Sequence, residues 1–286
     1  MKFILEQPVG FSETGNRQHN EDSIYPSLRA VSSGDRLFMV CDGVGGHRKG
    51  EVASSLACTT LAACFGDSHL PASPEDLCRE AIARTREVFR STENADPQTR
   101  GMATTVTLLH FGEKGVLLAH LGDSRIYHIR SGRVLHRTSD HKWVNELVQS
   151  GVITEEQAAV HPQRNMISKV LTADRDDRPE TYFTADVQPG DFFFLCTDGV
   201  LEHLYDELLT YHLRESEDLS LPDMIESIRE ECYGKTSDNY TAYLIRVKAV
   251  ESERVIPDEK TAELVIRDEK TAEFGIPAKT GPAHDA

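Results

Sequence analysis

The sequence lacks a paired-cysteine motif, an export signal and a membrane span. Its 286 residues include six cysteines, but no two of them are spaced as Cys-x-x-Cys, which excludes a zinc knuckle and a thioredoxin-like motif. Within residues 1–11 the longest apolar run is Phe3–Leu5, far short of the about 7 to 15 residues of a signal peptide. No apolar run approaches the roughly 20 residues that cross a bilayer. These absences predict a cytoplasmic protein with reduced cysteines.

Basic residues are scarce relative to acidic ones. The chain has 31 Lys and Arg against 47 Asp and Glu, which gives a formal net charge of -16 at pH 7. A surface of that sign repels phosphate backbones and anionic lipid, so we expect no nucleic acid and no membrane among the partners. The apolar share of 39% is sufficient for a folded core.

Short strands can be recognised between residues that favour turns. Six segments rich in aliphatic or aromatic residues and bounded by Gly, Asp or Ser predict strands. They are residues 36–41, 115–121, 125–130, 133–137, 192–196 and 242–247. Ser131-Gly132 between two of them is typical of a hairpin. Since regular βαβ alternation is missing, the pattern predicts an α+β layered domain built on antiparallel sheets.

Helices are marked by capping residues at their starts and glycines at their ends. Ser73 before Pro74 predicts a capped helix start, and Thr154–Gln157 has the capping-box pattern. Three other segments end before or at a glycine, as helices with a glycine cap do. They are residues 51–65, 143–150 and 221–233.

The last part of the chain differs from the rest. Residues 250–286 contain nine acidic and five basic residues, with a near-repeat of residues 258–264 in residues 268–274. This segment is too short for a repeat fold and too polar to pack a core. We therefore divide the chain into a folded domain over residues 1–249 and a flexible acidic tail over residues 250–286.

Aspartates stand at the ends of several predicted strands. Asp42, Asp123 and Asp198 each follow an apolar run, Asp238 precedes one, and Asp22 lies in an acidic cluster near the N-terminus. Each of them alone is an ordinary turn residue. If their loops share one edge of the fold, however, the carboxylates repel one another unless cations lie among them. Oxygen ligands without His or Cys favour Mg²⁺ or Mn²⁺ over zinc.

Six short motifs follow one another along the chain. They are residues 17–22 (RQHNED), 42–47 (DGVGGH), 101–105 (GMATT), 122–125 (GDSR), 197–199 (TDG) and 237–239 (SDN). In this order they resemble the motifs of the metal-dependent type-2C protein serine/threonine phosphatases, the PPM family, in its bacterial form. Residues 140–165 resemble the flap segment of that branch. The resemblance covers roughly residues 8–248 and implies a four-layer α-β-β-α sandwich, with two central antiparallel β-sheets flanked by helix pairs.

The resemblance also implies a ligand set for two core metal ions, Mn²⁺ or Mg²⁺. Asp42 would bridge the two ions. Asp22 and the Gly43 carbonyl would serve one ion, and Asp198 and Asp238 the other. A water between the ions would lose a proton, and the resulting hydroxide would attack phosphorus in line without a phosphoenzyme. The implied function is hydrolysis of phosphoserine and phosphothreonine in proteins, opposing a Ser/Thr kinase in signalling.

Further residues receive roles from the same resemblance. Asp123, together with Asp198, would hold a third and more weakly bound ion. Arg17 would bind the substrate phosphate, which its planar guanidinium suits. Glu21 would orient metal-bound water from outside the ligand set. His47 would either protonate the leaving oxygen or support its loop, and the sequence does not favour one role over the other.

Four residues beside these motifs are expected to be structural. Thr104 and Thr105 should be strand residues that pack near the site. Cys41 and Cys196 flank proposed ligands but lie in predicted strands, so they should be buried and unreactive thiols.

Two alternative functions stay open. The chain could be a regulatory module that docks a kinase or scaffold. Thr261 and Thr271 occupy matched acidic contexts that suit phosphorylated docking sites. The alternative is a tail that only increases solubility. The chain could also be a phosphatase specialised for one partner, chosen by the flap at residues 141–165. The expected partners of the phosphatase are phosphorylated protein substrates, namely a Ser/Thr kinase or its targets.

Overall fold

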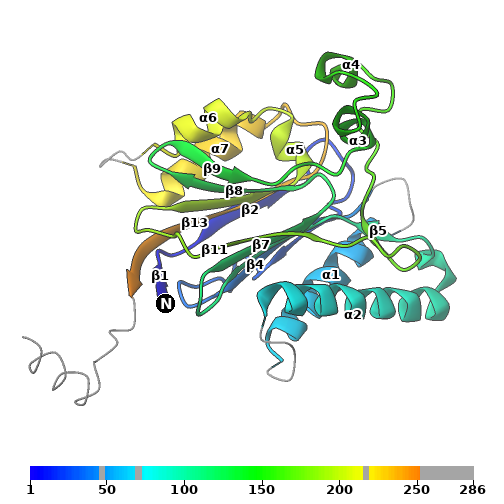
Figure 1. The fold of residues 1–286 in the computed structure, drawn as a ribbon, viewed down its shortest axis with the longest axis horizontal. Coiled ribbons are helices and arrows are strands. Elements are labelled where there is room, and N and C mark those ends of the chain that lie inside the picture. Colours follow the sequence, from blue (N-terminus) through cyan, green and yellow to red (C-terminus); the bar gives the residue numbers. More distant parts are fainter. Residues whose placement is uncertain (45–48, 68–72, 215–218, 252–286) are drawn as a thin grey trace, which may run out of the picture. The chain divides into compact units, whose positions relative to one another are not determined.

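Two antiparallel sheets face each other in the middle of the protein (Figure 1). The computed structural model describes residues 1–44, 49–67, 73–214 and 219–251. The first sheet contains β1 (Lys2–Leu5), β2 (Val9–Glu13), β8 (Arg125–Arg130), β9 (Arg133–Arg137), β12 (Phe192–Cys196) and β13 (Tyr240–Glu251). Its strand order is β1-β13-β12-β8-β9, and β2 pairs with β13 as well.

The second sheet has five strands in the order β11-β7-β6-β4-β3. They are β3 (Asp22–Tyr25), β4 (Leu37–Asp42), β6 (Val106–Phe111), β7 (Val116–Leu121) and β11 (Glu180–Thr184). A separate pair joins β5 (Ala103–Thr104) to β10 (Leu171–Thr172). Every pairing in both sheets is antiparallel, as the sequence predicts.

Helices cover the outer face of each sheet. α1 (Gly50–Phe65) and α2 (Pro74–Ala95) pack on the second sheet, and α2 is followed by the short 3₁₀ helix η1 (Pro97–Thr99). α5 (Asp198–Leu201), α6 (Asp206–His212) and α7 (Leu221–Cys232) pack on the first sheet. α3 (Trp143–Gln149) and α4 (Glu155–Ala159) lie beside the sandwich in the flap segment (Figure 1). The predicted α+β sandwich of four layers is therefore confirmed.

The strands are apolar on both faces because both faces are covered. In β7, Leu117 and Ala119 point to the helices α1 and α2, whereas Val116 and Leu118 point to the other sheet. This alternation follows from the two-residue repeat of a strand. Between the sheets, large rings meet edge to face, as Phe111 does with Phe193 at a centroid distance of 5.4 Å.

The local signals in the sequence are confirmed where they are strongest. Ser131 and Gly132 have φ angles of 49° and 70° and join β8 to β9 as a tight hairpin. The Ser73 side chain accepts a hydrogen bond from the Asp76 N–H at the start of α2. Thr154 and Gln157 form the predicted capping box of α4. Within the described ranges, no helix has the length and apolar character required to cross a membrane.

The expected tail falls almost wholly outside the described residues. Residues up to Glu251 form one compact unit. β13 continues through Glu251, and residues 252–286, with Thr261 and Thr271, lie outside the described residues. The division between residues 249 and 250 therefore stays a prediction.

Candidate metal centre

Five aspartates gather where strands of both sheets end. Asp22 begins β3, Asp42 ends β4, and the two are paired directly across these strands. Asp123 follows β7, Asp198 opens α5 just after β12, and Asp238 precedes β13. The charges of the other four contribute to raising the pKa of Asp42, after burial, which is the main cause. The structure thus brings together the five aspartates that the sequence singles out.

The surroundings of these carboxylates oppose their ionisation. Burial is the main cause that raises the pKa of Asp22 to about 7, with Asp198 and Asp238 adding repulsion. Burial, followed by the charges of Asp123 and Asp238, raises the pKa of Asp198 to about 7 as well. One oxygen each of Asp22, Asp123 and Asp198 is buried and has no hydrogen-bond partner. A buried carboxylate oxygen without a partner is a suitable position for a cation. Since all the candidate ligand atoms are oxygens, the ion that fits is a hard divalent one.

Two glycines beside the aspartates leave no room for a side chain. A Cβ atom on Gly43 would lie 2.3 Å from the Gly50 carbonyl oxygen, and one on Gly199 would lie 2.0 Å from the Asn239 carbonyl oxygen. The Gly43 N–H also donates to the Glu21 carbonyl at 3.1 Å. The Asp-Gly pairs therefore reflect close packing of the backbone around the cluster.

Thr104 and Thr105 hold the backbone of Asp42. The Thr104 hydroxyl and the Thr105 N–H both donate to the Asp42 carbonyl, at 2.7 and 2.8 Å. The Asp42 N–H in turn donates to the Thr105 Oγ1 at 3.0 Å. Both residues pack beside the site, as predicted, and fix the end of β4.

The sequence analysis missed two side chains that tie the site together. The Thr197 hydroxyl donates to Asp22 Oδ2 at 3.0 Å, which links the two sheets. Asn239 accepts a hydrogen bond from the Glu21 N–H at 2.8 Å, and its amide donates to the carbonyls of Thr14 and His19. Both residues directly adjoin predicted ligands, and this position within the motifs was the available signal.

Arg17 and Glu21 lie at the rim of the cluster. The Arg17 guanidinium is half exposed, and its Nη2 is 2.7 Å from Asp238 Oδ2. Burial, and then the charge of Glu51, raises the pKa of Glu21. The roles predicted for these two residues stay predictions. His47 lies outside the described residues.

The two cysteines beside the ligands are buried, as predicted. Cys41 and Cys196 have no solvent exposure. A hydrogen bond with Cys58, together with burial, raises the pKa of Cys41 well above its usual value, and burial raises the pKa of Cys196. Buried thiols with raised pKa values react poorly.

A lysine reaches the aspartate cluster from the base of the flap. Lys142 Nζ lies 3.3 Å from Asp123 Oδ2 and 3.4 Å from Asp140 Oδ2. Burial lowers the pKa of Lys142, but the charges of Asp123 and Asp140 outweigh burial and raise it overall. Asp140 also accepts two hydrogen bonds from Arg125, at 2.6 and 2.9 Å. The sequence analysis did not single out Lys142, because a loop lysine carries no local signal.

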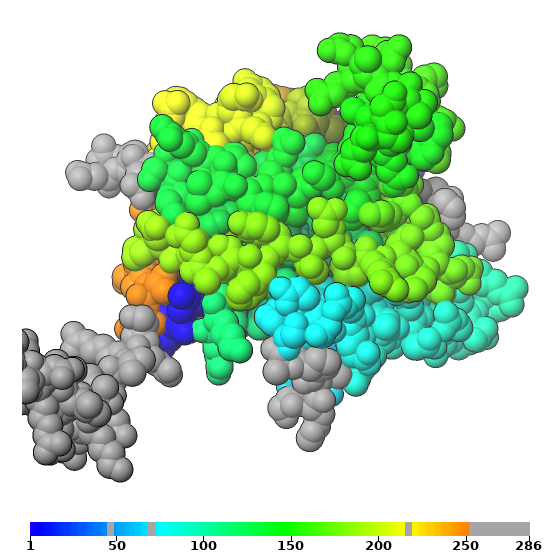
Figure 2. Space-filling model, in the orientation of Figure 1, coloured from blue at the N-terminus to red at the C-terminus, as the bar shows by residue number. Residues whose placement is uncertain are grey.

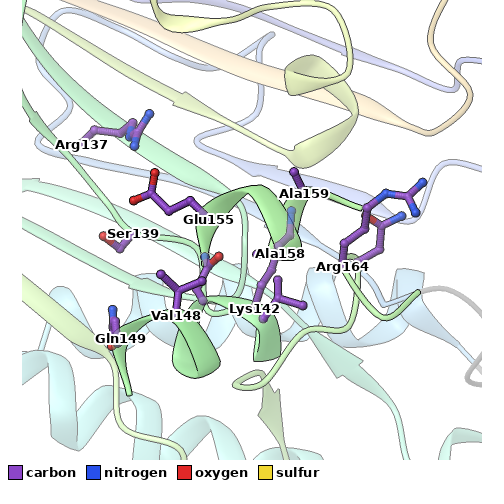
Figure 3. A pocket seen from close by; sticks show the side chains of 12 residues that line it. Arg137, Ser139, Lys142, Val148, Gln149, Glu155, Ala158, Ala159 and Arg164 are labelled. Carbon is purple, nitrogen blue, oxygen red and sulfur yellow. The ribbon is translucent and has the colours of Figure 1, made fainter. Parts of the chain in front are cut away.

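An open pocket of about 560 Å³ lies under the flap (Figure 3). Lys142 lines it together with residues from β9, α3, α4 and the segment after α4. The other lining residues are Arg137, Ser139, Val144, Asn145, Val148, Gln149, Glu155, Ala158, Ala159, Arg164 and Asn165. Lys142 also contacts Asp123, but none of the five aspartates is among the residues that line the pocket.

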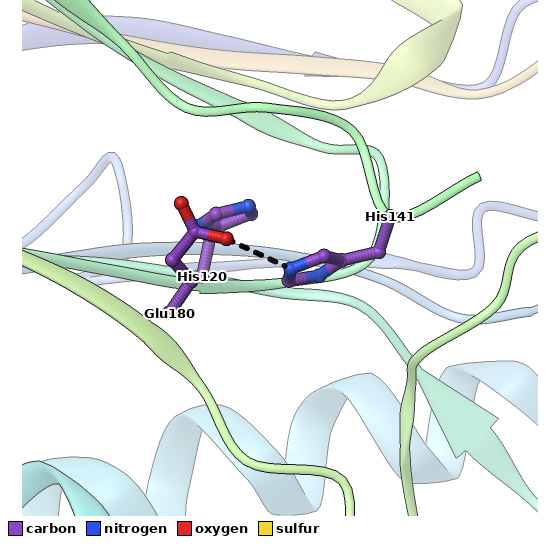
Figure 4. Close-up of side chains that lie close together, drawn as sticks. All are labelled: His120, His141 and Glu180. Atoms are coloured by element: carbon purple, nitrogen blue, oxygen red, sulfur yellow. Dashed lines mark ion pairs between the residues drawn. The ribbon is translucent and has the colours of Figure 1, made fainter. Parts of the chain in front are cut away.

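His120, His141 and Glu180 form a separate cluster at the base of the flap (Figure 4). His141 Nδ1 accepts a hydrogen bond from the Gly122 N–H at 3.1 Å, so the neutral ring carries its proton on Nε2. The two imidazoles stack at 4.4 Å with an interplanar angle of 5°, which leaves their in-plane lone pairs parallel. Parallel lone pairs do not both point at one ion, so the two rings do not fit a shared metal ion. The hydrogen bond between Gly122 and His141 instead anchors the flap.

Known proteins resemble this chain over most of its length. The family profile described as protein phosphatase 2C matches residues 9–231. The serine/threonine protein phosphatase PstP of Mycobacterium tuberculosis is 35% identical over 214 residues, which are 74% of this chain and 38% of PstP. The protein phosphatase PhpP of Streptococcus pneumoniae is 30% identical over 259 residues, which are 88% of this chain and 100% of PhpP.

A solved structure shows the same likeness in three dimensions. The catalytic domain of the serine/threonine protein phosphatase PstP, in complex with two manganese ions, has a TM-score of 0.71 and 29% identity. The similarity covers 86% of this chain and 100% of that one. The resemblance in the sequence motifs is thereby confirmed, and this chain belongs to the protein phosphatase 2C family.

Proposed function

We propose that this chain is a Mn²⁺- or Mg²⁺-dependent phosphatase that hydrolyses phosphoserine and phosphothreonine in proteins. The observation that carries the proposal is the aspartate cluster, in which Asp22, Asp123 and Asp198 each have a buried oxygen without a partner. Such a cluster is stable in its charged form only with cations among its members. Membership of the protein phosphatase 2C family and the two manganese ions bound to PstP support the same assignment.

The proposed ligands of the two core ions are five residues. Asp42 would help to hold both ions, Asp22 and the Gly43 carbonyl would hold one of them, and Asp198 and Asp238 would hold the other. When bound, the ions lower the pKa of a water and offset negative charge on the phosphoryl group. The contacts of Thr104, Thr105 and Thr197 support this assignment, because they hold Asp42 and Asp22 in place.

Arg17 and Glu21 complete the proposed site from its rim. With Asp238 engaged as a ligand, the Arg17 guanidinium would be free to direct two of its N–H groups at phosphoryl oxygens. The Glu21 carboxylate accepts a hydrogen bond from water at the site and so orients it. We assign a third and weaker ion to Asp123 and Asp198.

Metal removal tests the proposal directly. Protein stripped with a chelator should lose turnover of a phosphothreonine peptide, and added Mn²⁺ should restore it. Unchanged turnover in excess chelator would refute metal dependence. A peptide carrying phosphotyrosine at the same position controls for the class of substrate.

His47 keeps two competing roles that one variant can separate. A residue that protonates the leaving oxygen matters for an alkoxide leaving group and little for an acidic phenol. If His47 is the proton donor, His47→Gln should lose turnover of a phosphothreonine peptide while keeping most turnover of an aryl phosphate. Equal losses on both substrates would favour a structural role in the loop.

The open pocket under the flap is the proposed place for the residues of the substrate that flank the phosphate. Arg137, Lys142 and Arg164 line it against one acidic residue, Glu155. A phosphopeptide panel, measured with and without Mn²⁺ on full-length and tail-deleted protein, would show whether the flap selects a partner. Strong preference for one peptide would favour the specialised phosphatase, and uniform turnover would favour a general one.

A docking role for the tail is the second candidate function. The near-repeat places Thr261 and Thr271 in matched acidic contexts, which would suit phosphorylation by a kinase that the enzyme opposes. Mass spectrometry after incubation with such a kinase tests this idea, and absence of phosphate on both threonines would count against it.

The six free cysteines, all buried, support a cytosolic location.

A further inference from the structure

Asp123 has two oxygens in different situations. Its side chain is buried with 2% exposure. Oδ2 faces the Lys142 ammonium at 3.3 Å, whereas Oδ1 is buried without a hydrogen-bond partner. One oxygen is therefore neutralised from within the chain, and the other is available to an external cation.

The backbone fixes the position from which Lys142 reaches Asp123. The neighbouring His141 N–H donates to the Gly122 carbonyl at 2.9 Å, and the Ser168 N–H donates to the His141 carbonyl at 2.7 Å. Lys142 itself forms an antiparallel bridge with Ile167. Lys142 thus lies where the flap joins the sandwich. It directly follows His141, whose N–H and carbonyl are both hydrogen-bonded.

The charge of Lys142 is directed chiefly to Asp123. Asp140, its other partner, already pairs in bidentate fashion with Arg125, so Asp140 needs no second cation. The group consists of two carboxylates, Asp123 and Asp140, and two basic side chains, Lys142 and Arg125. Without the lysine, Asp140 would keep Arg125, and Asp123 would have no basic partner in this group. The Lys142 side chain is 22% exposed, which leaves the ammonium partly shielded from water.

We propose that Lys142 is a built-in counterion that competes with a third divalent cation for Asp123 and keeps the affinity of that cation low. The inference rests on the proposed function. An ammonium within about 4 Å of a divalent ion repels it, and even in a medium as polar as water this repulsion changes affinity by roughly tenfold or more. The third ion therefore binds Asp123 weakly for as long as the lysine stays beside it.

The test counts Mn²⁺ ions bound to the full-length protein, with free Mn²⁺ followed by electron paramagnetic resonance. Lys142→Met keeps the aliphatic stem and removes the charge. It should tighten the third site at least tenfold relative to the wild type, and leave the two core sites unchanged. Lys142→Gln should do the same, which guards against a folding defect peculiar to one variant.

Two matched variants sharpen the outcome. Lys142→Arg keeps the charge and should stay within about threefold of the wild type at the third site. Asp123→Asn combined with Lys142→Met should lose the gained ion. A third-site affinity in both neutral variants within twofold of the wild type would overturn the inference, as would a gain that persists without Asp123. If the wild type binds no Mn²⁺ at all, the proposed function itself fails, so the two failures are distinguishable.

Discussion

The two ends of β12 carry aspartates with opposite surroundings. Asp191 precedes the strand and is fully buried, yet it accepts hydrogen bonds from Arg130 at 2.6 Å and from His128 at 2.8 Å. Burial alone raises its pKa, but these partners outweigh burial and lower the pKa below its usual value. Asp198, just beyond the other end, has its pKa raised to about 7 by burial and by neighbouring carboxylates.

The difference distinguishes carboxylates whose partners are side chains of the protein from carboxylates whose partner would be a bound ligand. The chain supplies Asp191 with the Arg130 guanidinium and with a hydrogen bond from His128, so this residue has its partners within the fold. Asp198 keeps an oxygen without a partner and lies among like charges, an arrangement that costs stability and persists where function requires it. The same contrast separates Asp140, which Arg125 pairs, from Asp22.

The largest expected effect is the loss of turnover in Asp198→Asn. The amide removes one ligand of a core ion and one charge that cations would offset. Turnover of a phosphothreonine peptide in saturating Mn²⁺ should fall on the order of a thousandfold, since loss of a partner outside the ligand set already costs about 10-fold to 100-fold. Asp176→Asn, which changes an exposed aspartate, is the control. Turnover within threefold of the wild type would refute the assignment of Asp198.

The matched change at the other end of β12 should act on stability instead. Asp191→Asn leaves His128 without its carboxylate partner and Arg130 with Asp186 alone, and breaking a buried pair in this way costs about 3 kcal/mol. Urea denaturation of metal-free protein measures the change in unfolding free energy. Asp198→Asn under the same conditions should cost little or even stabilise, because it relieves repulsion. Similar losses of unfolding free energy in the two variants would contradict the proposed difference between Asp191 and Asp198.

The stability that Asp191 contributes should depend on pH in a defined direction. Its pKa is lowered in the folded protein, so the contribution is present above the unfolded value of about 4 and is lost as pH falls through the folded value. The difference in unfolding free energy between the wild type and Asp191→Asn should therefore shrink by about 1 kcal/mol from pH 7 to pH 3, and further below pH 3. A difference that grows toward low pH would contradict the pairing.

Much of the fold and the aspartate set could be predicted from the sequence because their signals are local. The predicted strands become β4, β7, β8, β9, β12 and β13, each an apolar run that ends at turn residues. Seven strands were not predicted, namely β1, β2, β3, β5, β6, β10 and β11. β3 and β11 are edge strands that are partly exposed and mix polar with apolar residues, whereas β6 is a buried central strand. An edge strand has less apolar surface to bury, so its composition carries a weaker signal.

The contacts that hold the site together could not be predicted from the sequence. Thr197 and Asp22 are 175 positions apart in the chain, and Lys142 meets Asp123 only because the base of the flap folds back beside β7. No local pattern encodes such a meeting. The close approach of Gly43 to Gly50, which excludes side chains at both positions, is likewise a contact that appears only in the structure.

The smallest effect is expected for a hydroxyl that touches the cluster from outside. Thr197 accepts a backbone N–H from Thr241 at 3.0 Å and donates to Asp22 at 3.0 Å. Thr107 is equally buried and also accepts a backbone N–H, from Val40, but donates to a carbonyl away from the site. The two threonines therefore differ in what their hydroxyls orient.

Replacing each threonine with valine should separate stability from metal binding. Both variants lose one acceptor for a buried N–H, so each should lose about 1 to 2 kcal/mol of unfolding free energy without metal. Only Thr197→Val removes a hydrogen bond to the Asp22 carboxylate, and the affinity of this variant for Mn²⁺ should fall about tenfold, measured by calorimetric titration. Equal Mn²⁺ affinities in the two variants would mean that the Asp22 carboxylate does not depend on Thr197 for its position, and that burial within the cluster is enough to hold it.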